Sequence, residues 1–144
     1  MSDRKEGCKF CKLINRELPI NVIYEDEKVI SFMDIQPINP GHLLIIPKAH
    51  ATYLKELEPA TGGHMFTTAM KLSRALRVSG IKCDGVNLFL ADGEAAGQDV
   101  FHVHLHVIPR FVDDGFGFKL DDSYWTLPTR EELNEIANKI TKHI

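Results

Sequence analysis

Short runs of apolar and β-branched residues divide much of the chain into strands separated by polar turns. The runs "NVIYED" and "KVISFMDI" are separated by an acidic turn and predict a β-hairpin. The run "HLLIIPK" is almost continuously apolar, which is typical of a central strand. The runs "GVNLFLAD" and "DVFHVHLHVIPR" predict two more strands, the second closed by Pro109.

Helical spacing and end signals predict three helices. The segment "CKFCKLINRELP" contains helix formers and ends at Pro19. The segment "PATGGHMFTTAMKLSRALRVSG" predicts a long helix that stops near Gly80, with an apolar face made of Phe66, Ala69, Met70, Ser73 and Leu76. The segment "TREELNEIANKITKHI" predicts a C-terminal helix, with a capping box of Thr129 and Glu132 and an apolar face of Leu133, Ile136, Ala137 and Ile140.

The order of these elements predicts an α+β fold. Hairpin connections favour an antiparallel sheet of about five strands, with the helices on one side of it. A chain of 144 residues is enough for one compact domain and too short for two ordinary ones. Residues 1–144 are therefore expected to form a single domain.

Composition and charge narrow the classes of partner. The net charge of −3 gives no basic surface for nucleic acid or for an anionic membrane, so neither is an expected partner. No apolar run approaches the ~18 residues that span a bilayer, and "MSDRKEGCKFCK" lacks the apolar stretch of a signal peptide. A cytoplasmic location is therefore expected. A small anionic ligand stays compatible with this charge, because local donors can outweigh a weak overall field.

The densest candidate chemistry lies in "FHVHLHVIPR". In a strand, His102, His104 and His106 point to one face, and the apolar residues that alternate with them point to the other face, towards a core. Consecutive residues on one face have Cα atoms about 6.7 Å apart, so the outer two histidines are about 13 Å apart. Two neighbours can converge on one metal ion, but all three would be strained.

Separate roles for the three histidines are therefore favoured. A neutral imidazole is a fair nucleophile, and its covalent adducts react further. Neighbouring imidazoles can donate to a developing phosphate charge or protonate a leaving group near neutral pH. A zinc hydrolase with its ion on these histidines stays as an alternative.

A C-x-x-C pair, Cys8 and Cys11, opens the chain. Three cysteines, with Cys83 as the third, argue against a disulfide framework. A redox pair of this spacing would be expected within a βαβ unit, and this pair precedes the first strand. Two thiolates supply half of a tetrahedral zinc site, and histidines would have to supply the other half.

With these motifs the sequence resembles the histidine triad (HIT) superfamily, whose signature is His-x-His-x-His followed by two apolar residues. The resemblance covers nearly the whole chain and rests on "CKFCKLI", "MDIQPINPGHLLIIPKAH", "DGEAAGQ", "FHVHLHVIPR" and the C-terminal helix. It is strongest to bacterial-type members with an N-terminal C-x-x-C. It implies an HIT-like fold.

The resemblance implies a catalytic set of His104, His106, Gln98 and His42. His104 would attack the α-phosphorus of a nucleotide, and water would then cleave the nucleotidyl-histidine to release a nucleoside monophosphate, expected to be AMP. His106 would contact the phosphate and support the leaving group. Gln98 would position the bridging oxygen, and His42 matches another histidine near the triad.

The resemblance also implies a nucleotide-binding set of Asp34, Ile35, Gly97, Gln98, Asp99, His104 and His106. Asp34 would accept hydrogen bonds from the ribose hydroxyls, and Ile35 would pack on the base. The glycines of "DGEAAGQ" would let backbone N–H groups approach a phosphate.

Two residues depart from the family pattern. Ala91 stands where many relatives have Asn, so one polar contact to the ligand is absent or supplied elsewhere. Asp99 stands where many relatives have a Ser or Thr that touches the phosphate. A carboxylate there repels a phosphate unless it faces away.

The resemblance further implies one structural zinc ion and a two-fold partner. The zinc ligands would be Cys8, Cys11, His50 and His102, with no open coordination position. A homodimer is implied, with the long helix and a sheet edge at its interface.

The expected function is therefore that of a histidine triad nucleotide hydrolase or transferase acting on a purine nucleotide. Its substrate classes would be nucleoside phosphoramidates, aminoacyl adenylates and dinucleoside polyphosphates. The alternative is a non-catalytic purine nucleotide-binding or interaction protein, which Ala91 and Asp99 favour.

Overall fold

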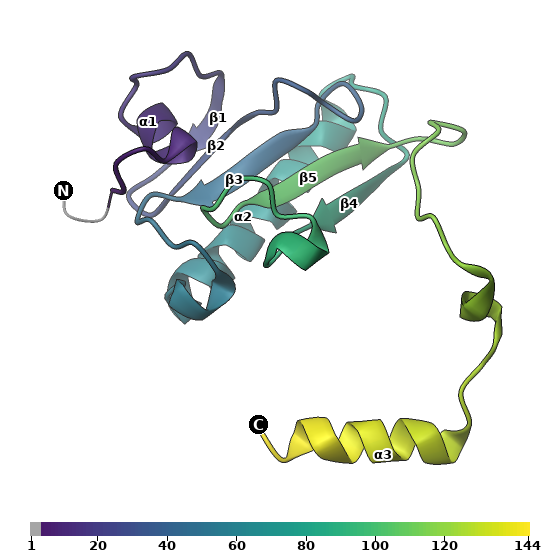
Figure 1. Cartoon of the computed structure of the whole chain (residues 1–144). Helices are drawn as coiled ribbons and strands as arrows, with labels where there is room; N and C mark the ends of the chain where they lie inside the picture. The colour runs from purple at the N-terminus through teal and green to yellow at the C-terminus, as the bar shows by residue number, and fades with distance from the viewer. Residues whose placement is uncertain (1–3) are drawn as a thin grey trace. The chain divides into compact units, whose positions relative to one another are not determined.

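The computed structural model describes residues 4–144, and its centre is one antiparallel five-stranded sheet in the order β1-β2-β3-β5-β4 (Figure 1). The strands are β1 (Val22–Glu25), β2 (Val29–Met33), β3 (Leu43–Pro47), β4 (Gly85–Phe89) and β5 (Leu105–Arg110). The α-helices are α1 (Lys9–Ile14), α2 (Pro59–Val78) and α3 (Arg130–Thr141). The α+β prediction is confirmed, with "HLLIIPK" as the central strand.

The predicted hairpin is β1 and β2, and Asp26 forms its turn. One carboxylate oxygen of Asp26 accepts hydrogen bonds from the backbone N–H groups of Lys28 and Val29, at 2.8 and 2.9 Å. The other accepts from Tyr24 Oη at 2.7 Å and lies 2.6 Å from His64 Nε2 on α2. The acidic turn therefore closes the hairpin and ties it to the long helix.

Helices cover both faces of the sheet, so the prediction that all of them lie on one side is wrong (Figure 1). On one face Val29, Leu43 and Ile45 pack with the apolar stripe of α2. On the other face the alternate residues of β2 and β3 pack with Phe10 and Leu13 of α1. Because the side chains of β2 and β3 are almost all buried on both faces, each face needs its own cover.

The buried stripe of α2 differs in part from the predicted one. Its buried residues are Thr61, Met65, Thr68, Ala69, Leu72 and Leu76. Phe66 and Met70, assigned to the core face from their spacing, are 55% and 61% exposed. Both apolar sets fit a helical period, and only packing against the sheet decides between them.

The histidine strand begins later than predicted, since β5 starts at Leu105. The backbone N–H of Val103 donates to the carbonyl of Ala51 at 2.7 Å, which ties the segment before β5 to the segment that follows β3. Val103, Leu105 and Val107 lie in the core on the α2 side. The predicted alternation therefore persists before the strand itself begins.

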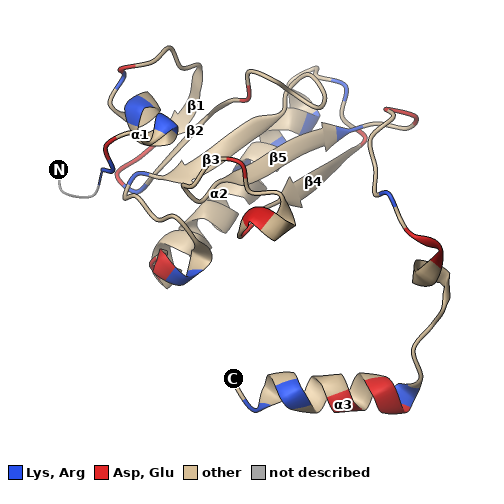
Figure 2. Cartoon of the chain, in the orientation of Figure 1, with Lys and Arg blue, Asp and Glu red and all other residues tan. Residues whose placement is uncertain are grey.

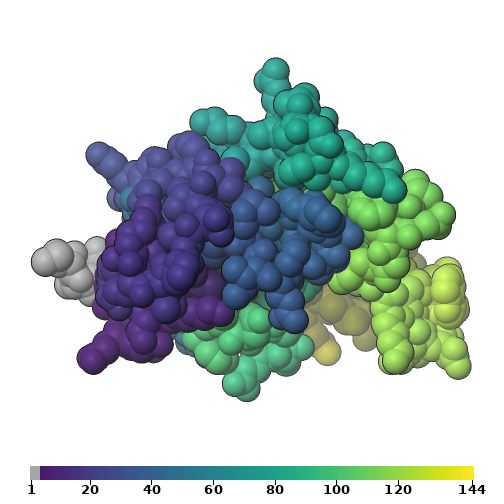
Figure 3. Space-filling view, turned by 90° about the horizontal axis from the view of Figure 1, so that it is seen from above, coloured from purple at the N-terminus to yellow at the C-terminus, as the bar shows by residue number. Residues whose placement is uncertain are grey.

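Charged residues lie mainly outside the strands, which are tan over most of their length in Figure 2. Seen from above in Figure 3, the purple N-terminal segment lies beside the blue segment that leads into β3. Within residues 4–144, no helix is both long and apolar enough to cross a bilayer.

The chain divides into two compact units, and the second consists of Gly115–Ile144. It contains a 3₁₀ turn, Asp122–Trp125, and α3. The predicted capping box is present: Thr129 Oγ1 accepts from the Glu132 N–H, and Glu132 accepts from the Thr129 N–H. The apolar face of α3 is exposed. The single-domain assignment of residues 1–144 stays a prediction.

Candidate active site

His104 lies just before β5 and presents one ring nitrogen to a cleft. Its side chain is 2% exposed, and its Nδ1 lies 2.8 Å from the backbone carbonyl of His102. A carbonyl only accepts, so Nδ1 carries the proton and neutral His104 keeps its lone pair on Nε2. Phe10 packs edge-on against the ring, with centroids 5.2 Å apart. The local backbone thus sets the tautomer that a nucleophilic imidazole requires.

His42 and His106 form a directed hydrogen-bond chain beside His104. The backbone N–H of Ile38 donates to His42 Nδ1 at 3.0 Å, so the proton of neutral His42 is on Nε2. That N–H donates to His106 Nδ1 at 2.8 Å. Neutral His106 must then carry its proton on Nε2, where it can donate to a ligand.

Burial keeps this pair neutral near pH 7. Burial, together with the charges of His104 and His42, lowers the pKa of His106 to about 4. Burial also lowers the pKa of His42, against the opposing charge of Asp34. The carboxylate of Asp34 lies 3.5 Å from His42 Nε2, the same nitrogen that donates to His106.

The same three side chains could bind a metal ion by composition, since their ligand atoms lie within 4.8 Å of one another. Two nitrogens on one tetrahedral ion, each bonded at about 2.0–2.1 Å, would be about 3.3 Å apart. The two facing nitrogens of His42 and His106 are 2.8 Å apart, which fits a hydrogen bond instead. The geometry therefore favours the hydrogen-bond chain over a catalytic zinc at this position.

The cleft in front of His104 and His106 has a volume of about 690 Å³. Its wall is largely apolar and includes Phe10, Leu13, Leu18, Ile20, Phe32 and Leu44. Asp34 and Ile35 lie at its edge, and Ile35 is 82% exposed. The predicted binding residues Asp34, Ile35, Asp99, His104 and His106 thus line one space. Lys9 and Phe10, which also line it, were not predicted, because nothing in "CKFCK" indicates which way α1 turns.

Gln98 is close in sequence to Asp99 and His104, but it does not line this cleft. It is 5% exposed, and its Oε1 accepts from the backbone N–H of Gly93 at 2.8 Å. Its Nε2 donates to the carbonyls of Thr52 and Val100, at 2.8 and 3.1 Å. In this conformation the amide fixes the loop before the histidines. A hydrogen bond from Nε2 to a leaving group would have to replace one of its two bonds to these carbonyls.

The two departures from the family pattern occupy different environments. Ala91 is 5% exposed and packs inside the fold. Asp99 has a side chain that is 82% exposed, and one of its carboxylate oxygens lies 3.5 Å from His104 Nε2. Gly97, which precedes Gln98, has φ +90°, a conformation that a side chain would strain.

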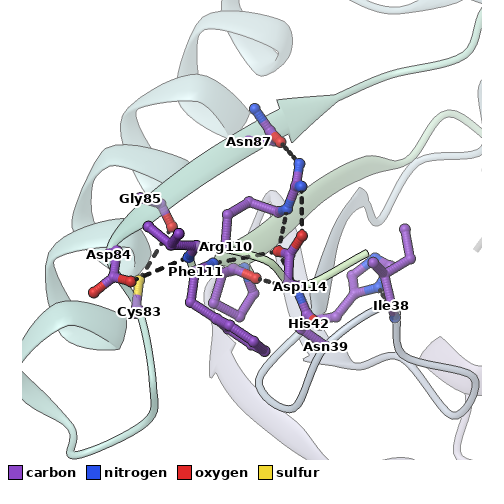
Figure 4. A network of polar contacts seen from close by, with 12 residues as sticks. Ile38, Asn39, His42, Cys83, Asp84, Gly85, Asn87, Arg110, Phe111 and Asp114 are labelled. Carbon is purple, nitrogen blue, oxygen red and sulfur yellow. Dashed lines mark hydrogen bonds and ion pairs between the residues drawn. The ribbon is translucent and has the colours of Figure 1, made fainter. Parts of the chain in front are cut away.

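A polar clamp holds the loop that carries His42 (Figure 4). Asn39 Nδ2 donates to the Pro109 carbonyl at 3.0 Å and to Asp114 at 2.9 Å. Arg110 forms a bidentate pair with Asp114, at 2.6 and 2.7 Å. The sequence marks "PINPG" only as a turn, so the role of Asn39 and Asp114 was missed.

Gly41 allows the same loop to lie close to β5. Its φ is +98°, and a Cβ there would lie 3.1 Å from a methyl of Ile81 and 3.2 Å from the Pro109 ring. The glycine is thus required for conformation and for space.

A second cluster lies on the other side of His104 and brings together Cys8, Cys11, His50 and His102. The Sγ atoms of Cys8 and Cys11 lie 3.5 and 3.7 Å from His102 Nδ1, and Cys11 Sγ lies 3.4 Å from His50 Nδ1. His102 Nε2 lies 2.8 Å from the Pro47 carbonyl, which places the proton there and leaves Nδ1 free to ligate.

These distances fit a tetrahedral zinc ion. With Zn–S of about 2.3 Å and Zn–N of about 2.0–2.1 Å, sulfur and nitrogen ligands would be about 3.5 Å apart. Burial lowers the pKa of His102 to about 4, which keeps it in the neutral form that ligates. Burial raises the pKa of the Cys11 thiol, a cost that a bound cation would reverse.

The family follows from these features and from sequence comparison. The chain belongs to the HIT family: the HIT domain model matches residues 15–113. An uncharacterized HIT-like protein of Borreliella burgdorferi is 47% identical over 113 residues, which is 78% of this chain and 81% of that protein. The adenylylsulfatase HINT3 of Arabidopsis thaliana is 33% identical over 99% of this chain and 72% of that protein.

Solved structures show the same fold. A HIT family protein from Bacillus anthracis superposes with a TM-score of 0.86 at 37% identity, covering 96% of this chain and 98% of that one. A zinc-bound histidine triad protein from Mycobacterium smegmatis gives 0.75 at 38% identity, covering 92% and 97%. A histidine triad nucleotide-binding protein from Candida albicans gives 0.80 at 30% identity, covering 94% and 96%.

Proposed function

We propose that this protein transfers or hydrolyses nucleotides at the α-phosphate through a nucleotidyl-histidine intermediate on His104. The observation that carries the proposal is the Nε2 lone pair of His104, which faces the cleft while Nδ1–H is held by the His102 carbonyl. This arrangement orients a nucleophile without the need for a charged partner.

In the first step, Nε2 of His104 forms a bond to the α-phosphorus, and the bond from phosphorus to the leaving group breaks. The leaving group departs with the electron pair and takes up a proton from solvent, and the Nε2–H of neutral His106 is placed to donate a hydrogen bond to a phosphoryl oxygen or to that group. In the second step, water attacks phosphorus and the histidine leaves, releasing a nucleoside monophosphate. Loss of the water-derived proton to solvent leaves His104 in its neutral form.

The cleft suits a purine nucleotide in size and lining. Its apolar wall offers a surface for a base, and Ile35 at the edge can cover the base's other face. Asp34 offers acceptor oxygens to a ribose diol. The Candida albicans relative is named a nucleotide-binding protein, and HINT3 is named an adenylylsulfatase. Both names are consistent with a nucleotide in this cleft.

We also propose a structural zinc ion on Cys8, Cys11, His50 and His102. Four protein ligands leave no open position, so the ion would contribute binding energy to folding and no chemistry to turnover. It would tie α1, which carries Phe10 and one wall of the cleft, to the catalytic segment. The zinc-bound relative from Mycobacterium smegmatis supports the proposal.

The test is direct trapping of the intermediate. Adenosine 5′-phosphoramidate is mixed with the protein, quenched in acid-free denaturant within milliseconds to seconds, and analysed by mass spectrometry. We expect an adenylyl adduct on the peptide that contains His104, and AMP as the released product. Absence of both, with nucleotide bound in the cleft, would favour the alternative of a non-catalytic nucleotide-binding protein.

We propose a homodimer as the assembly. Exposed apolar side chains lie on α2, at Phe66 and Met70, and on α3, at Ile136 and Ile140. Such faces are typical of association surfaces. Sedimentation at micromolar concentration tests this, and a monomer at that concentration would contradict it.

A further inference from the structure

The charged side chains that line the cleft are unusual for a site that binds an anion. Among the described residues lining it, the Asp, Glu, Lys and Arg side chains are Lys9, Asp34 and Asp99. His106 adds no compensating charge near pH 7, because burial lowers its pKa to about 4. Two carboxylates therefore line the cleft with a single ammonium group opposing them.

The two carboxylates differ in how far they are engaged. Asp34 accepts a hydrogen bond from the Gln36 N–H at 2.8 Å and lies 3.5 Å from His42 Nε2. The Asp99 carboxylate has no hydrogen-bond donor among the described residues, and its near neighbour is His104 Nε2 at 3.5 Å. Since that nitrogen carries a lone pair in the neutral ring, it does not satisfy the carboxylate.

The loop around Asp99 contains no basic residue. Between Leu90 and His104 the acidic residues are Asp92, Glu94 and Asp99, with no Lys or Arg. In Figure 2 this loop, which leads into β5, contains red segments and no blue one. The charge of Asp99 beside the nucleophile is therefore not cancelled by its own loop.

We propose that Asp99 selects substrates by the charge of their leaving group. The inference rests on the proposed function and names its substrate class: nucleoside 5′-phosphoramidates whose amine leaving group carries an ammonium. An α-phosphate at His104 already brings one negative charge towards Asp99. A polyphosphate or carboxylate on the leaving group adds to the repulsion, and an ammonium relieves it.

The size of the effect follows from Coulomb's law at an exposed site. At about 7 Å and an effective dielectric constant of about 40–80, each unit charge changes the rate constant about three- to eightfold. Between a cationic and an anionic leaving group the difference is about ten- to fiftyfold. Raising the salt concentration should reduce it.

The test uses three adenosine 5′-phosphoramidates that differ in the tail of the amine. Their leaving groups are 1,3-diaminopropane, propylamine and β-alanine, which are cationic, neutral and anionic at the tail. We expect kcat/KM of the wild type to fall in that order. In Asp99→Asn the ratio of the cationic to the anionic substrate should fall to within about threefold.

The matched control is Glu94→Gln, which removes the same charge from an exposed position of the same loop that does not line the cleft. It should keep the wild-type ratio. An unchanged ratio in Asp99→Asn would overturn the inference, as would an equal loss in Glu94→Gln. Asp99 is exposed, so both variants should retain the melting temperature.

Failure of the proposed function gives a different result. If the wild type turned over none of the three compounds, nucleotidyl transfer would be wrong, and calorimetric dissociation constants for the same compounds would still measure the charge preference. Equal dissociation constants in the wild type and Asp99→Asn would then reject the charge preference as well.

Discussion

His102 and His104 are two residues apart, and both are buried. The ring nitrogen that stays free of a backbone hydrogen bond is Nδ1 in His102 and Nε2 in His104. His102 directs Nδ1 to two thiols in a closed cluster. His104 directs Nε2 to the open cleft. One short segment thus contains a histidine suited to ligation and another suited to attack.

The difference comes from the carbonyl that each ring meets. The Pro47 carbonyl takes the Nε2 proton of His102, and the His102 carbonyl takes the Nδ1 proton of His104. Each bond leaves the other nitrogen of the neutral ring with its lone pair. The two residues have the same side chain and lie in the same short segment. Their different roles therefore follow from the backbone carbonyl that each ring contacts.

The largest effect is expected for a substitution of His104, the histidine that faces the cleft. His104→Asn removes the proposed nucleophile, while the amide of the new side chain can still donate to the His102 carbonyl. We expect kcat to fall by about 10⁴-fold or more, as for other nucleophile deletions, with no adenylyl adduct. The free energy of unfolding should change by less than about 1 kcal/mol, because the buried hydrogen bond is kept. Urea titration and single-turnover kinetics measure the two quantities.

Substantial residual turnover in His104→Asn, above a few per cent of wild type, would place the nucleophile elsewhere. His106→Asn serves as the comparison variant. It removes a donor and should cost about 10²- to 10³-fold in kcat, while the adduct on His104 still forms.

The next largest effect is expected for a substitution in the cluster of Cys8, Cys11, His50 and His102. Cys11→Ser should abolish stoichiometric zinc and lower the free energy of unfolding by about 4 kcal/mol, because loss of a metal site removes binding energy from the folded state. Turnover measured below the melting transition should fall much less than in His104→Asn. Zinc content by mass spectrometry and urea denaturation measure the loss.

The third cysteine supplies the control for that variant. Cys83 is half-buried and its Sγ donates to the Gly85 carbonyl at 3.3 Å, away from the cluster. Cys83→Ser should keep zinc and most of the stability. Zinc retained in Cys11→Ser, or a chelator that stops turnover before it lowers the melting temperature, would contradict a purely structural ion.

The sequence predicted the strands and the alternation around His104 because both depend on local apolar pattern. The sequence could not place α1 on the face of the sheet opposite α2. A fully apolar strand such as β3 can pack against a helix on either face, so its pattern does not tell the two faces apart. Phe66 was wrongly placed in the core because two apolar stripes of α2 satisfy one helical period. These errors concern packing partners that lie far away in the chain.

The candidate site residues were predicted from the resemblance to the HIT family. The structure adds their hydrogen-bond partners, which the resemblance does not give. The set of cleft residues came from the motifs, yet Gln98 turns inward to the loop backbone. Asn39 was missed because its partners, Pro109 and Asp114, lie 70 and 75 residues away. Side-chain hydrogen bonds over such separations leave no periodic signal in a single sequence.

A smaller effect is expected for a substitution of Asn39, which should change the cleft and leave the cysteine cluster intact. Asn39→Ala removes two hydrogen bonds from a buried amide, at a cost of about 2 kcal/mol in the free energy of unfolding. Because the loop also carries the Ile38 N–H that fixes the tautomer of His42, we expect kcat to fall about tenfold. Zinc content should be unchanged. A variant with normal kcat would show that the clamp serves stability alone.

The last expected effect is a pH dependence that separates the two sets of histidines. The pKa of His106 is about 4 in the folded protein and about 6.5 in an unfolded chain. The unfolded state therefore binds more protons between these values, and stability falls as the pH decreases from about 6.5 towards 4. His106→Gln should flatten this slope, whereas His143→Gln, at an exposed position, should leave it unchanged. In zinc-loaded protein the proposed ion would hold His102, so the contribution of His102 should appear as an abrupt loss of zinc at low pH. Urea midpoints measured from pH 7 to pH 4.5, with zinc release followed in parallel, distinguish the gradual cleft titration from the abrupt one. A slope that survives in His106→Gln would assign the acid sensitivity to the other buried histidines, which are His42 and His102.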